Sequence, residues 1–70
     1  MMSKIDEYRK IVETRSVGYV SHAGKRFLVD LTSANAIVTL YDAIDKETNK
    51  EKLMSLHPHA AAGVAFKLLK

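Results

Sequence analysis

The sequence has 70 residues, with 11 Lys and Arg against 8 Asp and Glu, so its net charge is +3 with neutral histidine. It contains no cysteine, which excludes disulfide scaffolds, cysteine-ligated zinc or iron–sulfur sites and thiol catalysis. This length predicts a single domain over residues 1–70. Because so short a chain buries only about 60% of its unfolded surface, we expect self-association to add stability.

The first expected element is a helix over Ser3–Thr14. Ser3 can cap its first turn, and Asp6 suits the positive end of the helix dipole. Apolar side chains recur at helical spacing on one face and predict the side that packs on the core: Ile5, Tyr8, Ile11 and Val12.

Two strands, Val17–His22 and Arg26–Leu31, are expected to form a hairpin. Both are rich in β-branched, aromatic and leucine residues, and Ala23-Gly24 supplies a two-residue turn. That turn places Gly18 opposite Val29 and Val20 opposite Phe27. These four residues would face the core, and Leu31 would continue the same face.

A second helix is expected over Ser33–Asp45, capped by Thr32 or Ser33. Its apolar side chains cluster on one side at helical spacing, which is typical of a helix that packs on a core. The clustered residues are Ala36, Ile37, Leu40, Tyr41, Ala43 and Ile44.

A third, short helix is expected to begin at a T-x-x-E capping box, Thr48 to Glu51. It would carry Leu53, Met54 and Leu56. The pair His57-Pro58 ends it, because proline disfavours helical geometry in the preceding residue.

The last expected helix, Pro58–Leu69, has an unusually wide apolar surface. Its alanine, valine, phenylalanine and leucine residues cover about 240° of its circumference. Either this helix is covered on most sides within the fold, or part of it contacts a partner, most simply a second copy. The candidate interface residues are Val64, Phe66, Leu68 and Leu69. The expected fold class is therefore α+β, with an N-terminal helix, a β-hairpin and three helices.

Basic residues suggest a second kind of contact. His22, Lys25 and Arg26 lie near the hairpin turn, and Lys50 and Lys52 lie on the third helix. They could contact an anion, a protein partner or, non-specifically, nucleic acid. Five residues instead of four separate the two glycines of this hairpin, which excludes a phosphate-binding P-loop. A helix-turn-helix motif that recognises a DNA sequence is disfavoured, because the last helix presents apolar side chains.

Neither a metal site nor a catalytic site is expected. His57 and His59 lie two residues apart at a helix start, where they do not share a face, and metal sites need three or four ligands. Ser21 and His22 are consecutive strand residues that point to opposite faces, and Asp30 is the only acid near them on these elements. The sequence therefore predicts neither an enzyme nor a bound cofactor.

The segments 28–37, 41–44, 49–52 and 64–69 give the chain a resemblance to a known class. Their pattern resembles short accessory proteins of bacteriophages and related mobile elements. The resemblance covers about residues 8–69, implies binding to host or defence proteins, and carries over no catalytic or binding residue.

The predicted function is a small non-catalytic protein-interaction module of phage type that binds a host or defence protein. We expect it to self-associate, as a dimer, through the last helix. The alternative is a nucleic-acid-binding protein that uses the hairpin turn together with Lys50 and Lys52. No apolar leader or membrane-spanning run is found in the sequence, so the expected location is the cytoplasm, that of the host for a phage protein.

Overall fold

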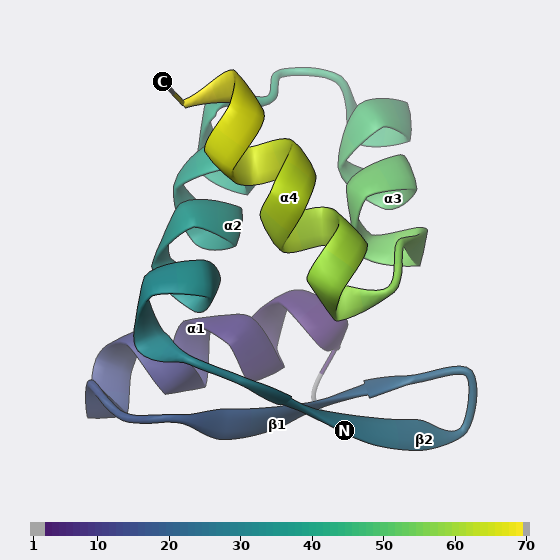
Figure 1. Ribbon diagram of the computed structural model, residues 1–70. Coiled ribbons are helices and arrows are strands. Elements are labelled where there is room, and N and C mark those ends of the chain that lie inside the picture. The colour runs from purple at the N-terminus through teal and green to yellow at the C-terminus, as the bar shows by residue number, and fades with distance from the viewer. Residues whose placement is uncertain (1–2, 70) are drawn as a thin grey trace.

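The computed structural model describes residues 3–69. It confirms the predicted α+β fold and the predicted order of elements (Figure 1). The elements are α1 (Lys4–Thr14), β1 (Gly18–His22), β2 (Lys25–Val29), α2 (Leu31–Ala43), α3 (Glu47–Ser55) and α4 (Pro58–Leu68).

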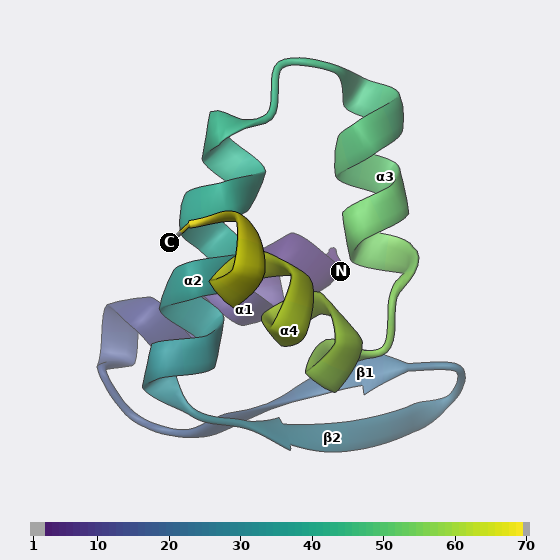
Figure 2. The ribbon, with the colours of Figure 1, turned by 45° about the horizontal axis from the view of Figure 1, so that its top comes forward.

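The hairpin forms one layer, and the helices lie on a single side of it (Figure 1). Helix α2 packs between α1 and α4, while β1 contacts α1 and β2 contacts α4. Turned by 45°, the molecule shows β2 on the same side as α4 and β1 behind it (Figure 2). The two strands therefore have different neighbours, and their outer edges are in different environments.

The hairpin has the predicted register, with Gly18 opposite Val29 and Val20 opposite Phe27. Ala23 and Gly24 both have positive φ, at 52° and 78°, which is the geometry of a type I′ turn. The expected continuation of the second strand to Leu31 is wrong. The strand ends at Val29, and Leu31 is the first residue of α2.

The caps of α1 and α2 explain where these helices begin. In α1 the Asp6 carboxylate accepts hydrogen bonds from the backbone N–H and the hydroxyl of Ser3, at 3.2 and 2.9 Å. In α2 the cap is Asp30, which accepts from the N–H of Ser33 at 2.8 Å. The predicted cap at Thr32 or Ser33 is wrong, because a carboxylate three residues before Ser33 already satisfies that free donor.

Helix α3 begins one residue before the predicted capping box. Its N-cap is Lys46, whose side chain makes no cap hydrogen bond, so Thr48 lies inside the helix. The helix ends at Ser55, and Leu56 is its C-cap. Pro58 is the first residue of α4 as predicted, and the Nδ1 atom of His57 accepts a hydrogen bond from the N–H of His59 at 3.1 Å.

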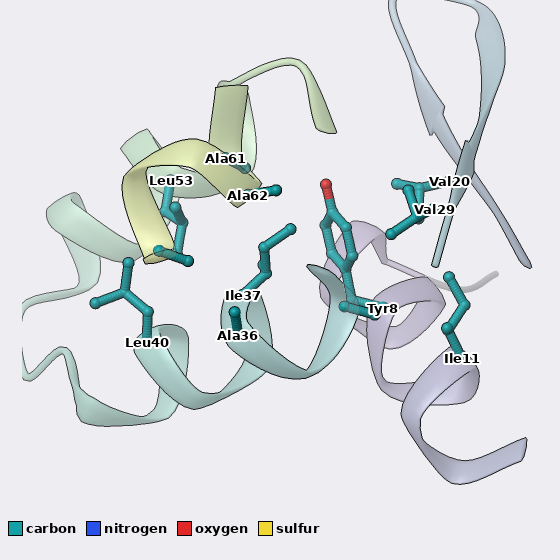
Figure 3. Packing of buried hydrophobic residues seen from close by; sticks show 12 residues of the cluster. Tyr8, Ile11, Val20, Val29, Ala36, Ile37, Leu40, Leu53, Ala61 and Ala62 are labelled. Carbon is teal, nitrogen blue, oxygen red and sulfur yellow. The ribbon is translucent and has the colours of Figure 1, made fainter. Parts of the chain in front are cut away.

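The core lies between α1, α2, α4 and the inner face of the hairpin (Figure 3). Its largest fully buried side chains are Tyr8, Ile37, Val20 and Pro58. Alanines from α2 and α4 account for much of the rest, so the helices approach closely around a small core. The alanines are Ala34, Ala36, Ala61, Ala62 and Ala65.

The predicted apolar face of α2 is confirmed in its centre, where Ala36, Ile37 and Leu40 are buried. Tyr41 and Ile44 are half-buried and pack against the edge of the core. Ala43, the last residue of α2, is exposed, because the chain leaves the core there to form the loop that leads to α3.

Candidate functional site

Helix α4 buries its small side chains and exposes its large ones. Pro58, Ala61, Ala62 and Ala65 face the core. All four predicted interface residues are exposed, with exposed fractions of 38% for Val64, 43% for Phe66, 64% for Leu68 and 42% for Leu69. The wide apolar arc is therefore only partly used within the described fold, and the bulkiest part of it faces solvent.

The exposed residues of α4 do not form a single face. Residues two positions apart on a helix point about 160° away from each other, so Phe66 and Val64 lie on opposite flanks. Val64 and Leu68 line an apolar hollow of about 330 Å³ against α2 and α3. Phe66 lines another hollow, of about 500 Å³, against β2 and the start of α2.

The outer face of the hairpin is a second exposed apolar surface, and none of its residues is among the predicted interface residues. Val17, Tyr19 and Leu28 are 59%, 55% and 53% exposed. Tyr19 lies directly opposite Leu28 in the hairpin register. Val17 and Leu28 also line the hollow beside Phe66, so this surface is continuous with one flank of α4.

His22 is held inside a cluster and does not project freely from the turn. The Nζ atom of Lys4 lies 2.7 Å from Nδ1 of His22 and donates to the carbonyl of Leu56 at 3.1 Å. The ring of His57 packs at 5.5 Å from that of His22 and at 4.2 Å from that of Phe27. Burial, the Lys4 ammonium and His57 lower the pKa of His22 below its usual value.

The other predicted basic residues contact different neighbours. The Arg26 guanidinium lies over the Tyr19 ring at 5.2 Å, whereas the Lys50 ammonium lies over Tyr41 at 5.0 Å. Lys52 lines the hollow between α2, α3 and α4, and Lys25 is exposed at the turn. The basic residues do not share one surface, as an electrostatic footprint on nucleic acid requires.

The residues considered for catalysis also have separate roles. Ser21 donates its backbone N–H to Glu7 at 2.8 Å, His22 contacts Lys4, and Asp30 caps α2. Within residues 3–69, no group of three His, Asp or Glu side chains is placed to hold a metal ion.

Comparison of the chain with known protein families, with curated protein sequences and with solved structures finds no match. Over the described range, none of the helices has the length and apolarity needed to cross a membrane. The exposed apolar side chains of α4 and of the hairpin are thus the features from which a function is inferred.

Proposed function

We propose that this chain is a small non-catalytic protein-interaction module that self-associates through α4. The observation that carries the proposal is the orientation of α4, whose alanines face inward while Val64, Phe66 and Leu68 face outward. Contiguous exposed apolar surface, such as that of Phe66 with Val17 and Leu28 beside it, is typical of a contact with another protein.

The surface area of the chain agrees with this proposal. The exposed area is 4810 Å², whereas a monomer of 7.8 kDa is expected to expose about 4,400 Å². A standard interface covers about 800 Å² of each partner, which is roughly a sixth of this surface. One contact that includes α4 would therefore bury more area than the difference between the observed and the expected surface.

A second copy is the partner that this surface favours. The two flanks of α4 are apolar, and the exposed residues between them are Ala60, Gly63 and Lys67. A surface with so little charge offers no electrostatic selection for a strongly charged partner, whereas two such surfaces bury each other's apolar side chains. Association into a two-fold dimer is the commonest form of self-contact.

The resemblance to phage accessory proteins adds a biological role to the proposal. Such a module would act in the host cytoplasm by binding a host or defence protein. Nucleic-acid binding through Lys25, Arg26, Lys50 and Lys52 receives less support, because the contacts of these residues place them on different parts of the surface.

Sedimentation equilibrium tests the self-association. We expect a mass of twice 7.8 kDa for the wild type, and at least a tenfold weaker dimer for Phe66→Glu. Ala60→Glu is the matched control, since Ala60 is exposed on the same helix between the two flanks. A wild-type monomer at millimolar concentration would overturn the proposal, and so would equal weakening by Phe66→Glu and Ala60→Glu. Circular dichroism verifies that each variant is folded.

A further inference from the structure

The two outer edges of the hairpin differ in how their backbone groups are satisfied. A two-residue turn makes His22 and Lys25 a hydrogen-bonded pair. The pairing then alternates, so the backbone groups of Tyr19 and Ser21 on β1, and those of Arg26 and Leu28 on β2, point away from the hairpin. The hydrogen bond from the Ser21 N–H to the Glu7 carboxylate, at 2.8 Å, agrees with this alternation.

The edge of β2 has no such cover. Apart from the hairpin ladder itself, no hydrogen bond within residues 3–69 reaches the backbone of Arg26 or Leu28. This edge lies on the side of α4 (Figure 2), and the hollow of about 500 Å³ runs beside it, lined among others by Leu28, Gly63 and Phe66. An open edge next to a hollow has room for one more extended strand.

We propose that this strand is β2 of a second copy, which adds antiparallel with Leu28 opposite Leu28 of the partner subunit. The two hairpins then form one continuous antiparallel sheet. This inference rests on the proposed self-association and specifies its geometry: the Phe66 flank of α4 belongs to the interface, together with the edge of β2. The Val64 and Leu68 flank stays outside it.

Charge complementarity along β2 fixes this register. Arg26 and Asp30 are equally far from Leu28, on either side of it. Arg26 shares the outer face of β2 with Leu28, and the same alternation extended by one residue beyond Val29 reaches Asp30. In the proposed pairing, Arg26 lies opposite Asp30 of the partner subunit, and the two-fold axis repeats the pair. Asp30 is the N-cap of α2 and keeps an extended backbone, with φ −84° and ψ 169°. Its carbonyl already accepts from the N–H of Ala34 at 3.0 Å, so its N–H is the group that would extend the ladder. A shift of register by two residues would lose both of these ion pairs.

The pairing would also stabilise the hairpin and cover an exposed apolar side chain. A two-stranded hairpin is marginally stable in water, and three or more strands are more stable. In the dimer the Leu28 side chains pack on each other, although each is 53% exposed in the single chain. On the helix side, Gly63 lines the hollow without a side chain, and the space beside it is open.

Disulfide cross-linking tests the register, since the chain has no native cysteine. In Leu28→Cys the two Cα atoms would lie about 5.5 Å apart, which a disulfide can span. Tyr19→Cys is the matched control, because Tyr19 lies on the same outer face but one strand away. The two Tyr19 positions would be about 14 Å apart, beyond disulfide reach. Under mild oxidation we expect a cross-linked dimer for Leu28→Cys alone.

The mass of the wild type separates the two claims. A wild-type dimer without a Leu28→Cys cross-link overturns the β2 pairing and leaves self-association through α4 standing. A wild-type monomer overturns both claims. Equal cross-linking of Leu28→Cys and Tyr19→Cys also contradicts the proposed register.

A charge reversal provides an independent readout. Arg26→Glu should weaken the dimer about tenfold, because it replaces two attractive cross-strand pairs with two repulsive ones. Lys25→Glu makes the same charge change one residue away, outside the paired segment, and should alter the dissociation constant by less than about twofold. Equal weakening by the two variants, measured by sedimentation, would overturn the register.

Discussion

The Glu7 carboxylate accepts a hydrogen bond from the backbone N–H of Ser21 at 2.8 Å, and so a side chain of α1 occupies the outer edge of β1. On the opposite edge, no side chain of the described residues forms a hydrogen bond with the backbone of Leu28. A sheet whose one edge is covered at Ser21, and whose other edge carries no such hydrogen bond, pairs preferentially through the uncovered edge, across a two-fold axis. This asymmetry favours a closed dimer over an open chain of subunits.

Removing the Glu7 carboxylate should therefore change the size of the assembly. In Glu7→Ala the edge of β1 becomes available, and we expect species larger than a dimer in light scattering as the concentration rises. Glu7→Gln is the control, because its amide oxygen can still accept from Ser21. A Glu7→Ala sample that stays dimeric at every concentration would show that Glu7 does not limit assembly.

The hydroxyl of Tyr8 is a source of instability in the core. The side chain is fully buried, and its Oη atom has no hydrogen-bond partner. Burial, with a smaller contribution from Glu7, raises the pKa of Tyr8 to about 12. Tyr8→Phe removes the unsatisfied group and should raise the free energy of unfolding by about 1 kcal/mol, as measured by urea denaturation. A lower stability in Tyr8→Phe would mean that the hydroxyl is satisfied in solution.

Gly18 is required by the close approach of β1 to α1. A Cβ atom at Gly18 would lie 2.7 Å from Cγ1 of Ile11, a buried core residue. We expect Gly18→Ala to lower the free energy of unfolding by about 1–3 kcal/mol through this overpacking.

Gly63→Ala is the control for Gly18→Ala. Its Cβ atom meets nothing within 4 Å, and alanine is the better helix former, so this variant should be up to about 1 kcal/mol more stable. Both changes are measured by urea denaturation at a concentration where the chain is monomeric. Equal effects of the two variants would contradict the packing of β1 on α1.

The cluster around His22 makes stability depend on pH. Burial, then the neighbouring Lys4 and His57, lower the pKa of His22 below its usual value of 6.5. The unfolded chain therefore binds this proton before the folded chain does. The contribution of His22 to stability is complete above about pH 6.5 and is lost as the pH falls through the lowered, folded-state pKa.

NMR titration of the histidine rings measures this effect. Lys4→Met removes the ammonium group that lies 2.7 Å from Nδ1 of His22, and it should raise the pKa of His22 toward its usual value. An unchanged pKa in Lys4→Met would show that the contact with Lys4 is not maintained in solution.

Local patterns predicted most of the fold. The spacing of Tyr8 and Ile11 located α1, and Ala23-Gly24 set the hairpin register. The errors lie at the junctions between elements. Asp30 was assigned to a strand, but its carboxylate is the cap of α2, and a cap and a strand end cannot be separated by alternation alone. Thr48 matched a capping box, but α3 begins at Glu47.

The candidate site was less accessible to prediction from the sequence. The apolar excess on α4 was visible, but periodicity does not say which neighbour covers each flank, so Phe66 was grouped with Val64. The outer face of the hairpin could have been found, because Val17 and Tyr19 alternate with residues already assigned to the core face. The open edge of β2 depends on the contact between Glu7 and Ser21, which are 14 residues apart, and no local pattern reports it.

Amide hydrogen exchange at Leu28 is the most direct test of the central claim, which is self-association across the edge of β2. In the single chain this N–H points to solvent, whereas in the dimer it donates to the carbonyl of Leu28 of the partner subunit. We predict that exchange at Leu28 slows markedly as the protein concentration rises, and that in Arg26→Glu the same slowing needs about a tenfold higher concentration. The N–H of Val29, which is paired inside the hairpin, serves as the internal reference. Fast exchange at Leu28 under conditions where the chain sediments as a dimer would contradict the account.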